Sequence, residues 1–199
     1  MARLLLATNN PGKVREFRRL LAGLPYEVLA PAEAGIELDV VEDGDSYDAN
    51  ARKKAEAFAA AGNCLALADD SGIEVDALDG RPGVYSARYG TPDLDDRGRL
   101  DLLLHELNGI PQPGRTARYR AVVAIARPGA TTRTFNGVME GSIGLEKRGE
   151  RGFGYDPAFL VADGRTAAEL SDAEKDAISH RGIAVRAAAA WLRDAPVSS

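Results

Sequence analysis

Residues 4–13 read LLLATNNPGK, a short continuous apolar run followed by polar residues, a proline, a glycine and a lysine. The apolar run 4–7 predicts a strand that is buried on both faces. Asn10 is suited to cap a helix that begins at Pro11, since proline is well placed in the first helical turn. Apolar residues then recur at helical spacing, at Val14, Phe17, Leu21 and Leu24. A strand, a turn and a helix at the start of the chain indicate an α/β fold.

A second helix and a second buried strand are expected further along the chain. Ser46 is placed to cap a helix over residues 47–61. The apolar run 64–68 predicts a strand that ends at the neighbouring carboxylates Asp69 and Asp70. Two acidic side chains would then follow directly on a buried strand.

The middle of the chain mixes extended segments with one helix. Residues 73–83 alternate apolar with acidic positions and contain glycine and proline, so we expect an extended, turn-rich segment. A helix with a stripe of leucines is expected to start at Thr91. Segments 116–126 and 132–143 predict a long antiparallel hairpin, and residues 158–162 a shorter strand.

Two helices are expected near the end of the chain. Ser171 and Glu174 have the spacing of a capping box, and Ser179 is suited to cap a final helix. Residues 196–199 are expected to fray. The buried face of the final helix is expected at Ile183, Ala187, Ala190 and Trp191. The whole pattern predicts one α/β domain over residues 1–199, with a two-lobed mixed sheet, flanking helices and the hairpin.

Composition narrows the class of protein. The chain has 199 residues, of which 45% are apolar and 28% charged, as in a globular domain with a buried core. A net charge of −5 argues against binding nucleic acid through a general positive field. The single cysteine, Cys64, excludes an intramolecular disulfide and, with only two histidines, the usual structural zinc sets. No apolar run approaches the ~20 residues that cross a bilayer, and none resembles a signal peptide, so no membrane contact and a cytoplasmic location are expected.

The turn after the first strand is a candidate anion site. It is polar, ends in a cation and leads into a helix N-terminus, where free N–H groups and the helix dipole favour phosphate. The turn is not a P-loop, because the pattern G-x-x-x-x-G-K-[ST] is absent from the sequence. An ordinary capped turn would explain the same residues. The candidate binding residues are Thr8, Asn9, Asn10, Pro11, Gly12 and Lys13.

Carboxylates from two separate segments form a candidate metal site. Glu42 and the neighbouring Asp69 and Asp70 lie at expected ends of elements, and Mg²⁺ needs only one or two carboxylates when a substrate supplies phosphate oxygens. Beside a metal, the neighbours Asp69 and Asp70 would differ in proton affinity, so one of them can act as a base. The alternative is that these carboxylates are solvated caps.

Two further clusters could contact a ligand. Asn50 and Lys54 are four residues apart, so they share one helix face and could hold an anion, although a solvated charged face is equally simple. A glycine-rich segment with an aromatic ring lets the backbone approach a flat ligand such as a purine, or forms a turn around a buried aromatic. Its residues are Phe153, Gly154, Tyr155 and Asp156.

The start of the final helix is a further candidate ligand-binding site. His180 and Arg181 lie at the positive end of that helix and could reach an anion or a carbonyl group, and Lys175 brings a further cation. Within an acidic chain, we expect local positive side chains, together with the metal, to compensate the charge of a triphosphate. These side chains would be those of Lys13, Lys54, Lys175 and Arg181.

Six ordered blocks together resemble the inosine triphosphate pyrophosphatases, over nearly the whole chain. The blocks are residues 8–13, 42–55, 68–72, 82–89, 152–157 and 174–182. The resemblance implies hydrolysis of the nonstandard purine nucleotides ITP, dITP and XTP to the monophosphate and pyrophosphate, with Mg²⁺, which removes them from the nucleotide pool. It also implies a homodimer with the active site in a cleft between the two lobes.

The resemblance implies roles for residues in five of the six blocks, all but 82–89. Glu42 and Asp70 take the places of the metal ligands, and Asp70 also that of the general base. Phosphate is contacted by residues 8–13, Lys54 and Ser71. The base and sugar are lined by Phe153, Gly154, Tyr155 and Asp156, and nucleotide recognition is completed by Lys175, His180 and Arg181. A 6-oxo group would accept hydrogen bonds from Arg181 and nearby backbone N–H groups, which adenine could not accept.

Two positions depart from the family pattern. Tyr47 stands where phenylalanine is expected, and Ala49 where an acidic residue is expected before Asn50. Both bear on the outer surroundings of the site. Two other functions fit the same residues: a pyrophosphatase for modified pyrimidine or methylated nucleotides, and a nucleotide-sensing module. Paired carboxylates at Glu42 and Asp70 argue against the second, and a purely structural protein would leave the clustering unexplained.

Overall fold

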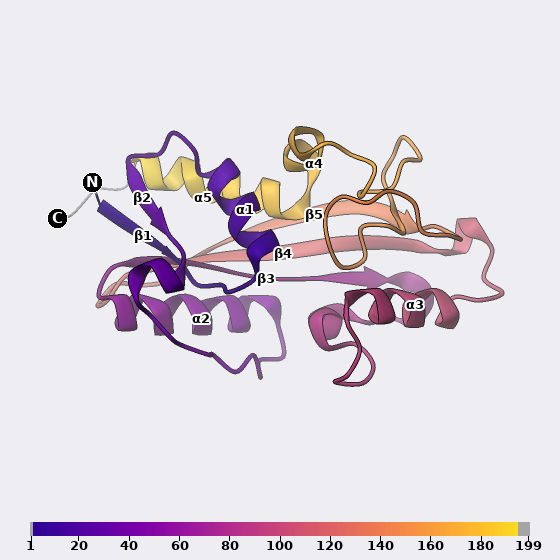
Figure 1. Ribbon diagram of the computed structural model, residues 1–199, viewed down its shortest axis with the longest axis horizontal. Helices are drawn as coiled ribbons and strands as arrows, with labels where there is room; N and C mark the ends of the chain where they lie inside the picture. The colour runs from indigo at the N-terminus through magenta and orange to yellow at the C-terminus, as the bar shows by residue number, and fades with distance from the viewer. Residues whose placement is uncertain (1, 195–199) are drawn as a thin grey trace. The chain divides into compact units, whose positions relative to one another are not determined.

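The computed structural model describes residues 2–194 and shows a mixed α/β fold (Figure 1). The strands are β1 (Ala2–Leu6), β2 (Tyr26–Leu29), β3 (Leu65–Val75), β4 (Thr116–Ala126), β5 (Arg133–Ile143) and β6 (Phe159–Leu160). They form one six-stranded sheet in the order β2-β1-β3-β4-β5-β6. β1 pairs in parallel with β2 and β3, whereas β5 and β6 pair antiparallel. The α/β class with a mixed sheet, expected from the sequence, is therefore confirmed.

Five α-helices accompany the sheet in the described chain. They are α1 (Pro11–Leu20), α2 (Tyr47–Gly62), α3 (Asp96–Glu106), α4 (Asp172–Ile178) and α5 (His180–Asp194). Within residues 2–194, no helix combines the length and the apolar character needed to cross a membrane. The expected frayed end at residues 196–199 lies outside the described residues.

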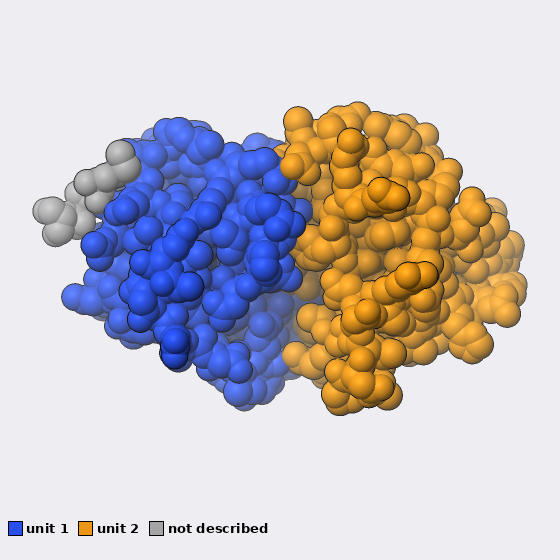
Figure 2. Space-filling view, viewed as in Figure 1, with its two compact units in different colours: residues 1–70, 121–137, 181–199 blue, residues 71–120, 138–180 orange. Residues whose placement is uncertain are grey.

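The chain divides into two compact units, which Figure 2 shows in different colours. Unit 1 contains residues 2–70, 121–137 and 181–194 of the described chain, and unit 2 contains residues 71–120 and 138–180. Two units agree with the two-lobed architecture that the sequence predicts. Each unit has a hydrophobic cluster of its own.

Unit 1 is built in layers, with α1 and α5 on one face of its strands and α2 on the other (Figure 1). Alternate residues of a strand point to opposite faces. Leu4 and Leu6 of β1 therefore join the buried cluster that contains Phe17 of α1 and Val185 of α5. Leu5 points the other way, toward the end of α2, where a side chain at Gly62 would come within 3.0 Å of it. The continuous apolar run of β1 is explained by burial on both faces.

Local capping sets the starts of the first two helices as predicted. The side-chain oxygen of Asn10 accepts hydrogen bonds from the backbone N–H groups of Gly12 and Lys13 at 2.8 and 3.2 Å. The Ser46 hydroxyl accepts from Ala49 N at 3.3 Å at the start of α2. A capping group satisfies N–H groups that have no partner within the helix.

Unit 2 packs α3 and several loops around its own core. Leu100, Leu103 and Leu107 are each at most 2% exposed, which confirms the predicted leucine stripe. The buried guanidinium of Arg115 donates to the carbonyl oxygens of Leu107, Ile110 and Gly144 at 2.7 to 2.9 Å. These bonds tie the end of α3 to the chain that follows it.

We expect the substitution Leu103→Ala to destabilise the protein by about 2–5 kcal/mol, because it leaves a cavity in the core of unit 2. Leu145→Ala is the matched control, since Leu145 is 65% exposed while Leu103 is fully buried. The control should change the free energy of unfolding by less than about 0.5 kcal/mol. Urea unfolding followed by circular dichroism measures both, and equal losses would contradict the assignment of Leu103 to the core.

Three predicted boundaries are wrong. β3 does not end before Asp69 but continues to Val75, so both aspartates lie within the strand. The strand can contain these carboxylates because lysine and arginine side chains lie within 4 Å of them. α3 begins at Asp96 rather than Thr91, because the Asp95 carboxylate caps Gly98 N at 2.8 Å. The strand expected over residues 158–162 has only two residues, and β2 has no counterpart in the prediction.

The predicted buried face of α5 is also wrong. Of the four expected positions, Ile183, Ala187 and Ala190 are exposed and Trp191 is only partly buried. The buried residues are instead Ala184, Val185, Ala188, Ala189 and Leu192. Alanines occur on several sides of this helix. The spacing of apolar residues alone therefore does not show which side is buried.

Candidate active site

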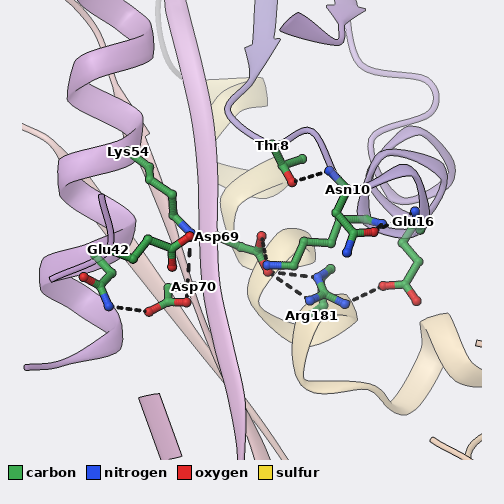
Figure 3. Close-up of polar contacts among 11 residues, drawn as sticks. Thr8, Asn10, Glu16, Glu42, Lys54, Asp69, Asp70 and Arg181 are labelled. Atoms are coloured by element: carbon green, nitrogen blue, oxygen red, sulfur yellow. Dashed lines mark hydrogen bonds and ion pairs between the residues drawn. The ribbon is translucent and has the colours of Figure 1, made fainter. Parts of the chain in front are cut away.

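The centre of the candidate site is the middle of β3, where Asp69 and Asp70 are neighbours (Figure 3). Because alternate side chains of a strand point to opposite faces, these two carboxylates separate. Asp70 lies on the side of α2, and Asp69 lies on the side of α1 and α5. The two carboxylates therefore meet different partners.

Asp70 faces an amide and an ammonium group from successive turns of α2. Asn50 Nδ2 donates to Asp70 Oδ2 at 2.9 Å, and Lys54 Nζ lies 3.9 Å from Asp70 Oδ1. Lys54 Nζ also lies 3.0 Å from Glu42 Oε1, so one cation faces both predicted metal carboxylates. The backbone N–H of Gly44 donates to Asn50 Oδ1 at 2.8 Å, which fixes the orientation of the amide. The structure thus brings together Glu42, Asn50, Lys54 and Asp70.

The protonation of Asp70 is suited to a base. Burial raises the pKa of the Asp70 carboxyl to about 6, partly offset by the charge of Lys54 and the Asn50 hydrogen bond, while Glu42 adds to the rise. A general base works best when its pKa lies near the working pH. Asp70 therefore combines a fixed geometry with a proton affinity higher than that of an exposed aspartate.

Asp69 binds two cations from opposite ends of the chain. Lys13 Nζ lies 2.9 Å from its Oδ1, and Arg181 donates from Nε and Nη2 to its Oδ2 at 3.1 and 3.0 Å. Arg181 Nη1 donates in turn to Glu16 Oε2 at 2.6 Å. Asp69, Glu16 and Arg181 are all buried. One carboxylate therefore joins the N-terminal and C-terminal helices of unit 1.

Burial and ion pairing together shift the pKa values of Asp69, Arg181 and Lys13. Burial alone would raise the pKa of Asp69, but the positive charges of Lys13 and Arg181 outweigh it and lower this pKa. Burial opposes the charge of Arg181 as well, yet Asp69 and Glu16 raise its pKa above the ordinary value. For Lys13, burial dominates over the attraction of Asp69 and lowers the pKa. Asp69 and Arg181 therefore stay ionised at neutral pH.

The roles of Asp69 and Glu16 were not predicted. The sequence marks the neighbouring aspartates as a candidate metal pair, and the resemblance gives a role to Asp70 alone. For Glu16, the only signal in the sequence is its position beside Phe17 on the apolar side of α1, where a carboxylate needs a buried partner. Arg181 is 165 residues away in the sequence, so no local pattern connects the two.

The four predicted cations do not form a surplus of positive charge by themselves. Each of the four predicted cations is paired with a carboxylate: Lys13 with Asp69, Lys54 with Glu42, Lys175 with Asp156, and Arg181 with Asp69 and Glu16. In unit 1, three of these cations face the four carboxylates Glu16, Glu42, Asp69 and Asp70. Buried charges are stable only when they are paired, which explains why each of these cations lies against a carboxylate. The cluster suits a divalent cation better than a bare anion.

The turn from Thr8 to Lys13 is well ordered internally. Thr8 Oγ1 accepts from Asn10 N at 3.2 Å, and Asn10 accepts from the N–H groups of Gly12 and Lys13. Pro11 has no N–H group. Three N–H groups of the turn that could face an anion, those of Asn10, Gly12 and Lys13, are thus bonded within it. Phosphate binding here stays a prediction.

A separate polar cluster lies in unit 2, around Asp156. Its Oδ2 accepts from Lys175 Nζ at 2.7 Å and from the backbone N–H of Phe153 at 2.9 Å. Lys175 Nζ lies 5.1 Å from the centre of the Phe153 ring, within range of a cation–π contact. A side chain at Gly152 would come within 2.1 Å of Asp156 Oδ2. Glycine is therefore needed for the loop to wrap around this carboxylate.

The remaining predicted residues of unit 2 lie as follows. Gly154 adopts φ 61°, a left-handed conformation that favours glycine. Tyr155 is buried, and its hydroxyl donates to Ser86 O at 2.8 Å, so its ring anchors the loop in the core of unit 2. His180 is 4% exposed at the start of α5. Ser71 is half-buried on β3 next to Asp70.

Comparison with known proteins identifies the family. A sequence model described as Ham1 family matches residues 4–191. A dITP/XTP pyrophosphatase from Bacillus subtilis (strain 168) is 48% identical over 187 residues, which cover 94% of each chain. Another from Desulforamulus reducens is 50% identical over 94% of this chain and 93% of its own. A solved HAM1 protein from Coxiella burnetii is 37% identical with a TM-score of 0.88, covering 98% of this chain and 100% of that one.

A Ham1 protein from Staphylococcus aureus agrees, at 38% identity and a TM-score of 0.85, over 96% of this chain and 98% of that one. Both the sequence and the fold of these relatives extend over nearly the whole of this chain. The resemblance stated from the six blocks is confirmed. The protein is a member of the Ham1 family.

Proposed function

We propose that this protein hydrolyses nonstandard purine nucleoside triphosphates, namely ITP, dITP and XTP, to the monophosphate and pyrophosphate. Relatives 48% and 50% identical over nearly the whole chain are named dITP/XTP pyrophosphatases. The observation that carries the proposal is the buried Asp70, held by Asn50 and facing Lys54 and Glu42. A base with a pKa near 6 beside a second carboxylate suits water-mediated cleavage of a phosphoanhydride.

Glu42 and Asp70 fit a magnesium ion. The described residues contain no group of three or more His, Cys, Asp or Glu side chains that could hold a metal. Mg²⁺, however, is commonly held by one or two carboxylates together with substrate phosphates. In this cluster, four carboxylates against three cations also favour a divalent cation. When bound, Mg²⁺ would neutralise phosphate charge and lower the pKa of a bound water.

The residues around Asp70 would then act in sequence. Asp70 takes a proton from the water that attacks the α-phosphorus, and pyrophosphate leaves. The amide of Asn50 keeps the accepting carboxylate oriented through the reaction. Lys54 is placed to contact the phosphate groups and to limit the repulsion between Glu42 and Asp70.

Base recognition is proposed for the cluster in unit 2. Phe153 provides a ring beside the Lys175 ammonium, and His180 adds a polar group. Hydrogen-bond donors that face a 6-oxo group would be left unpaired by the 6-amino group of adenine, which costs affinity for ATP. Nε, Nη1 and Nη2 of Arg181 each donate to Asp69 or Glu16, so a contact of Arg181 with the base would be made while these ion pairs hold the guanidinium in place.

The family resemblance also suggests a homodimer in the cytoplasm. The proposed substrate is a small molecule, and the net charge of −5 gives no support to nucleic acid as a partner. Analytical ultracentrifugation of the purified chain tests the dimer. A species with the 21.1 kDa mass of one chain at every concentration would contradict it.

The direct test is pyrophosphate release from ITP, dITP, XTP, ATP, GTP and dUTP, with Mg²⁺ and with EDTA. We expect kcat/KM for ITP and XTP to exceed that for ATP by about 10²- to 10⁴-fold, and EDTA to remove activity. Saturable ITP binding without pyrophosphate release would indicate a nucleotide sensor instead. A preference for dUTP or for methylated nucleotides would indicate the related pyrophosphatases.

A further inference from the structure

Tyr119 of β4 lies among the predicted nucleoside-binding residues of unit 2 but has no role in the function proposed above. Its side chain is 7% exposed and contacts two of those residues, His180 and Asp156. We propose that Tyr119 is a positioning residue, which holds the imidazole of His180 and the carboxylate of Asp156 in the orientation needed to bind the nucleoside. The inference rests on the proposed function for its kinetic consequences.

The ring of Tyr119 sets the plane of the His180 imidazole. The two rings stack with centroids 4.6 Å apart and planes inclined by only 8°. On the Tyr119 ring, Phe159 makes a second contact, tilted by 47° at 4.6 Å, and Phe159 is fully buried. A packed aromatic contact restricts the rotation of both rings. The direction in which the imidazole nitrogens point is therefore determined largely by Tyr119.

The hydroxyl of Tyr119 acts on the other residue. It donates to Asp156 Oδ1 at 3.3 Å, while Asp156 Oδ2 accepts from Lys175 Nζ and Phe153 N. The two oxygens of one carboxylate are thus divided between the strand on one side and the loop and α4 on the other. Because Phe153 and Lys175 both bind this carboxylate, its orientation decides where the ring and the ammonium group point.

The two contacts can be removed separately. Tyr119→Phe keeps the ring and its stack but removes the hydrogen bond to Asp156. Tyr119→Leu removes both. Tyr89→Phe is the matched control, because Tyr89 is 8% exposed in the same unit and its hydroxyl accepts a hydrogen bond from Arg81 rather than contacting the cluster. All three variants remove a buried hydroxyl.

The kinetic readout is the division of the effect between KM and kcat for ITP. We expect Tyr119→Phe to raise KM about two- to tenfold and Tyr119→Leu by more than about tenfold, with kcat changed less than about threefold. The effect should fall on binding rather than on chemistry, because Tyr119 contacts His180 and Asp156, which are proposed to bind the nucleoside. The control should keep the wild-type KM. Wild-type KM in both Tyr119 variants would overturn the inference, as would an equal rise in the control.

The spectroscopic readout does not depend on activity. The chain has two histidines, so the ring signals of His180 are assigned by a His180→Ala variant and compared with those of exposed His105. Stacking should displace the His180 signals, Tyr119→Phe should preserve the displacement, and Tyr119→Leu should abolish it. If Tyr119→Leu fails to fold, the wild-type and Tyr119→Phe spectra still decide. An undisplaced His180 signal in the wild type refutes the positioning role.

The two experiments separate the inference from the proposed function. A wild-type protein that releases no pyrophosphate from ITP would refute the proposed function. The spectra would still test whether Tyr119 stacks on His180. A wild type that hydrolyses ITP, with unchanged KM in both Tyr119 variants, would refute the inference and leave the function intact.

Discussion

Asp70→Asn is expected to lower the turnover of ITP by at least about 100-fold, since loss of a general base costs about 10²- to 10⁴-fold and a metal ligand is weakened as well. The substitution keeps the shape of the side chain and its place between Asn50 and Lys54. Pyrophosphate release measures turnover, and isothermal titration measures ITP binding, which should survive. Asp93→Asn, at an exposed position, is the control. Wild-type turnover in Asp70→Asn would refute the base assignment.

The same substitution should not weaken the fold. Burial raises the pKa of Asp70 from 3.8 in the unfolded chain to about 6, so the folded protein binds this proton more tightly. Its stabilising contribution is present below pH 3.8 and is lost as the pH rises through 6. Asparagine resembles the protonated form. In EDTA at pH 7.5, Asp70→Asn should therefore be at least as resistant to urea as the wild type, and the difference should shrink toward pH 4.

The pH dependence of wild-type activity should reflect the protonation of Asp70. A base must be deprotonated, so kcat/KM for ITP is expected to fall as the pH drops below about 6, the pKa of Asp70 in the free protein. Bound Mg²⁺ would lower this pKa and move the fall to more acidic pH. A profile that stays flat to pH 4 at saturating and at limiting Mg²⁺ would argue against Asp70 as the base.

Asp69→Asn, at the neighbouring position, should have the opposite effect on stability. It removes the charge that Lys13 and Arg181 share, and their side chains are only 17% and 3% exposed. Breaking a buried ion pair costs about 3–5 kcal/mol, because a charge is left uncompensated. Urea unfolding at pH 7.5 should show this loss in Asp69→Asn and none in Asp70→Asn. Equal stability of the two variants would contradict the separate roles of the two faces of β3.

The pH dependence of stability provides a second check on Asp69. Lys13 and Arg181 hold its pKa below the ordinary value of 3.8, despite burial. Its contribution is therefore present above pH 3.8 and lost as the pH falls below it. Wild-type protein should lose stability steeply in acid, and Asp69→Asn should lack this part of the loss. An identical acid dependence in both proteins would contradict the pairing.

Several elements could be predicted because their causes are local. Asn10 and Ser46 cap their helices through bonds to residues two or three positions away, so their sequence neighbourhood contains the whole interaction. The strands β4 and β5 follow from two β-rich segments around a short turn. The six blocks identified the family without knowledge of the fold.

Other elements depended on neighbours far away in the sequence. β3 was expected to end at Asp69 because the apolar run 64–68 stops there. It continues because Lys13 and Arg181 pair with that carboxylate from both ends of the chain. The buried side of α5 was equally undetermined, since alanine fits either side and only the packed strands select one.

The sequence by itself determined the α/β class, the capped starts of the first two helices and the family, because residue type and short spacing specify these directly. Only the tertiary structure decided which carboxylate each cation meets. It also decided that Asp69 and Asp70 work on opposite faces of one strand and that Tyr119 lies against His180. Charge pairing and ring packing act over a few ångströms of space, and the contacts they require join segments up to 165 residues apart in the chain.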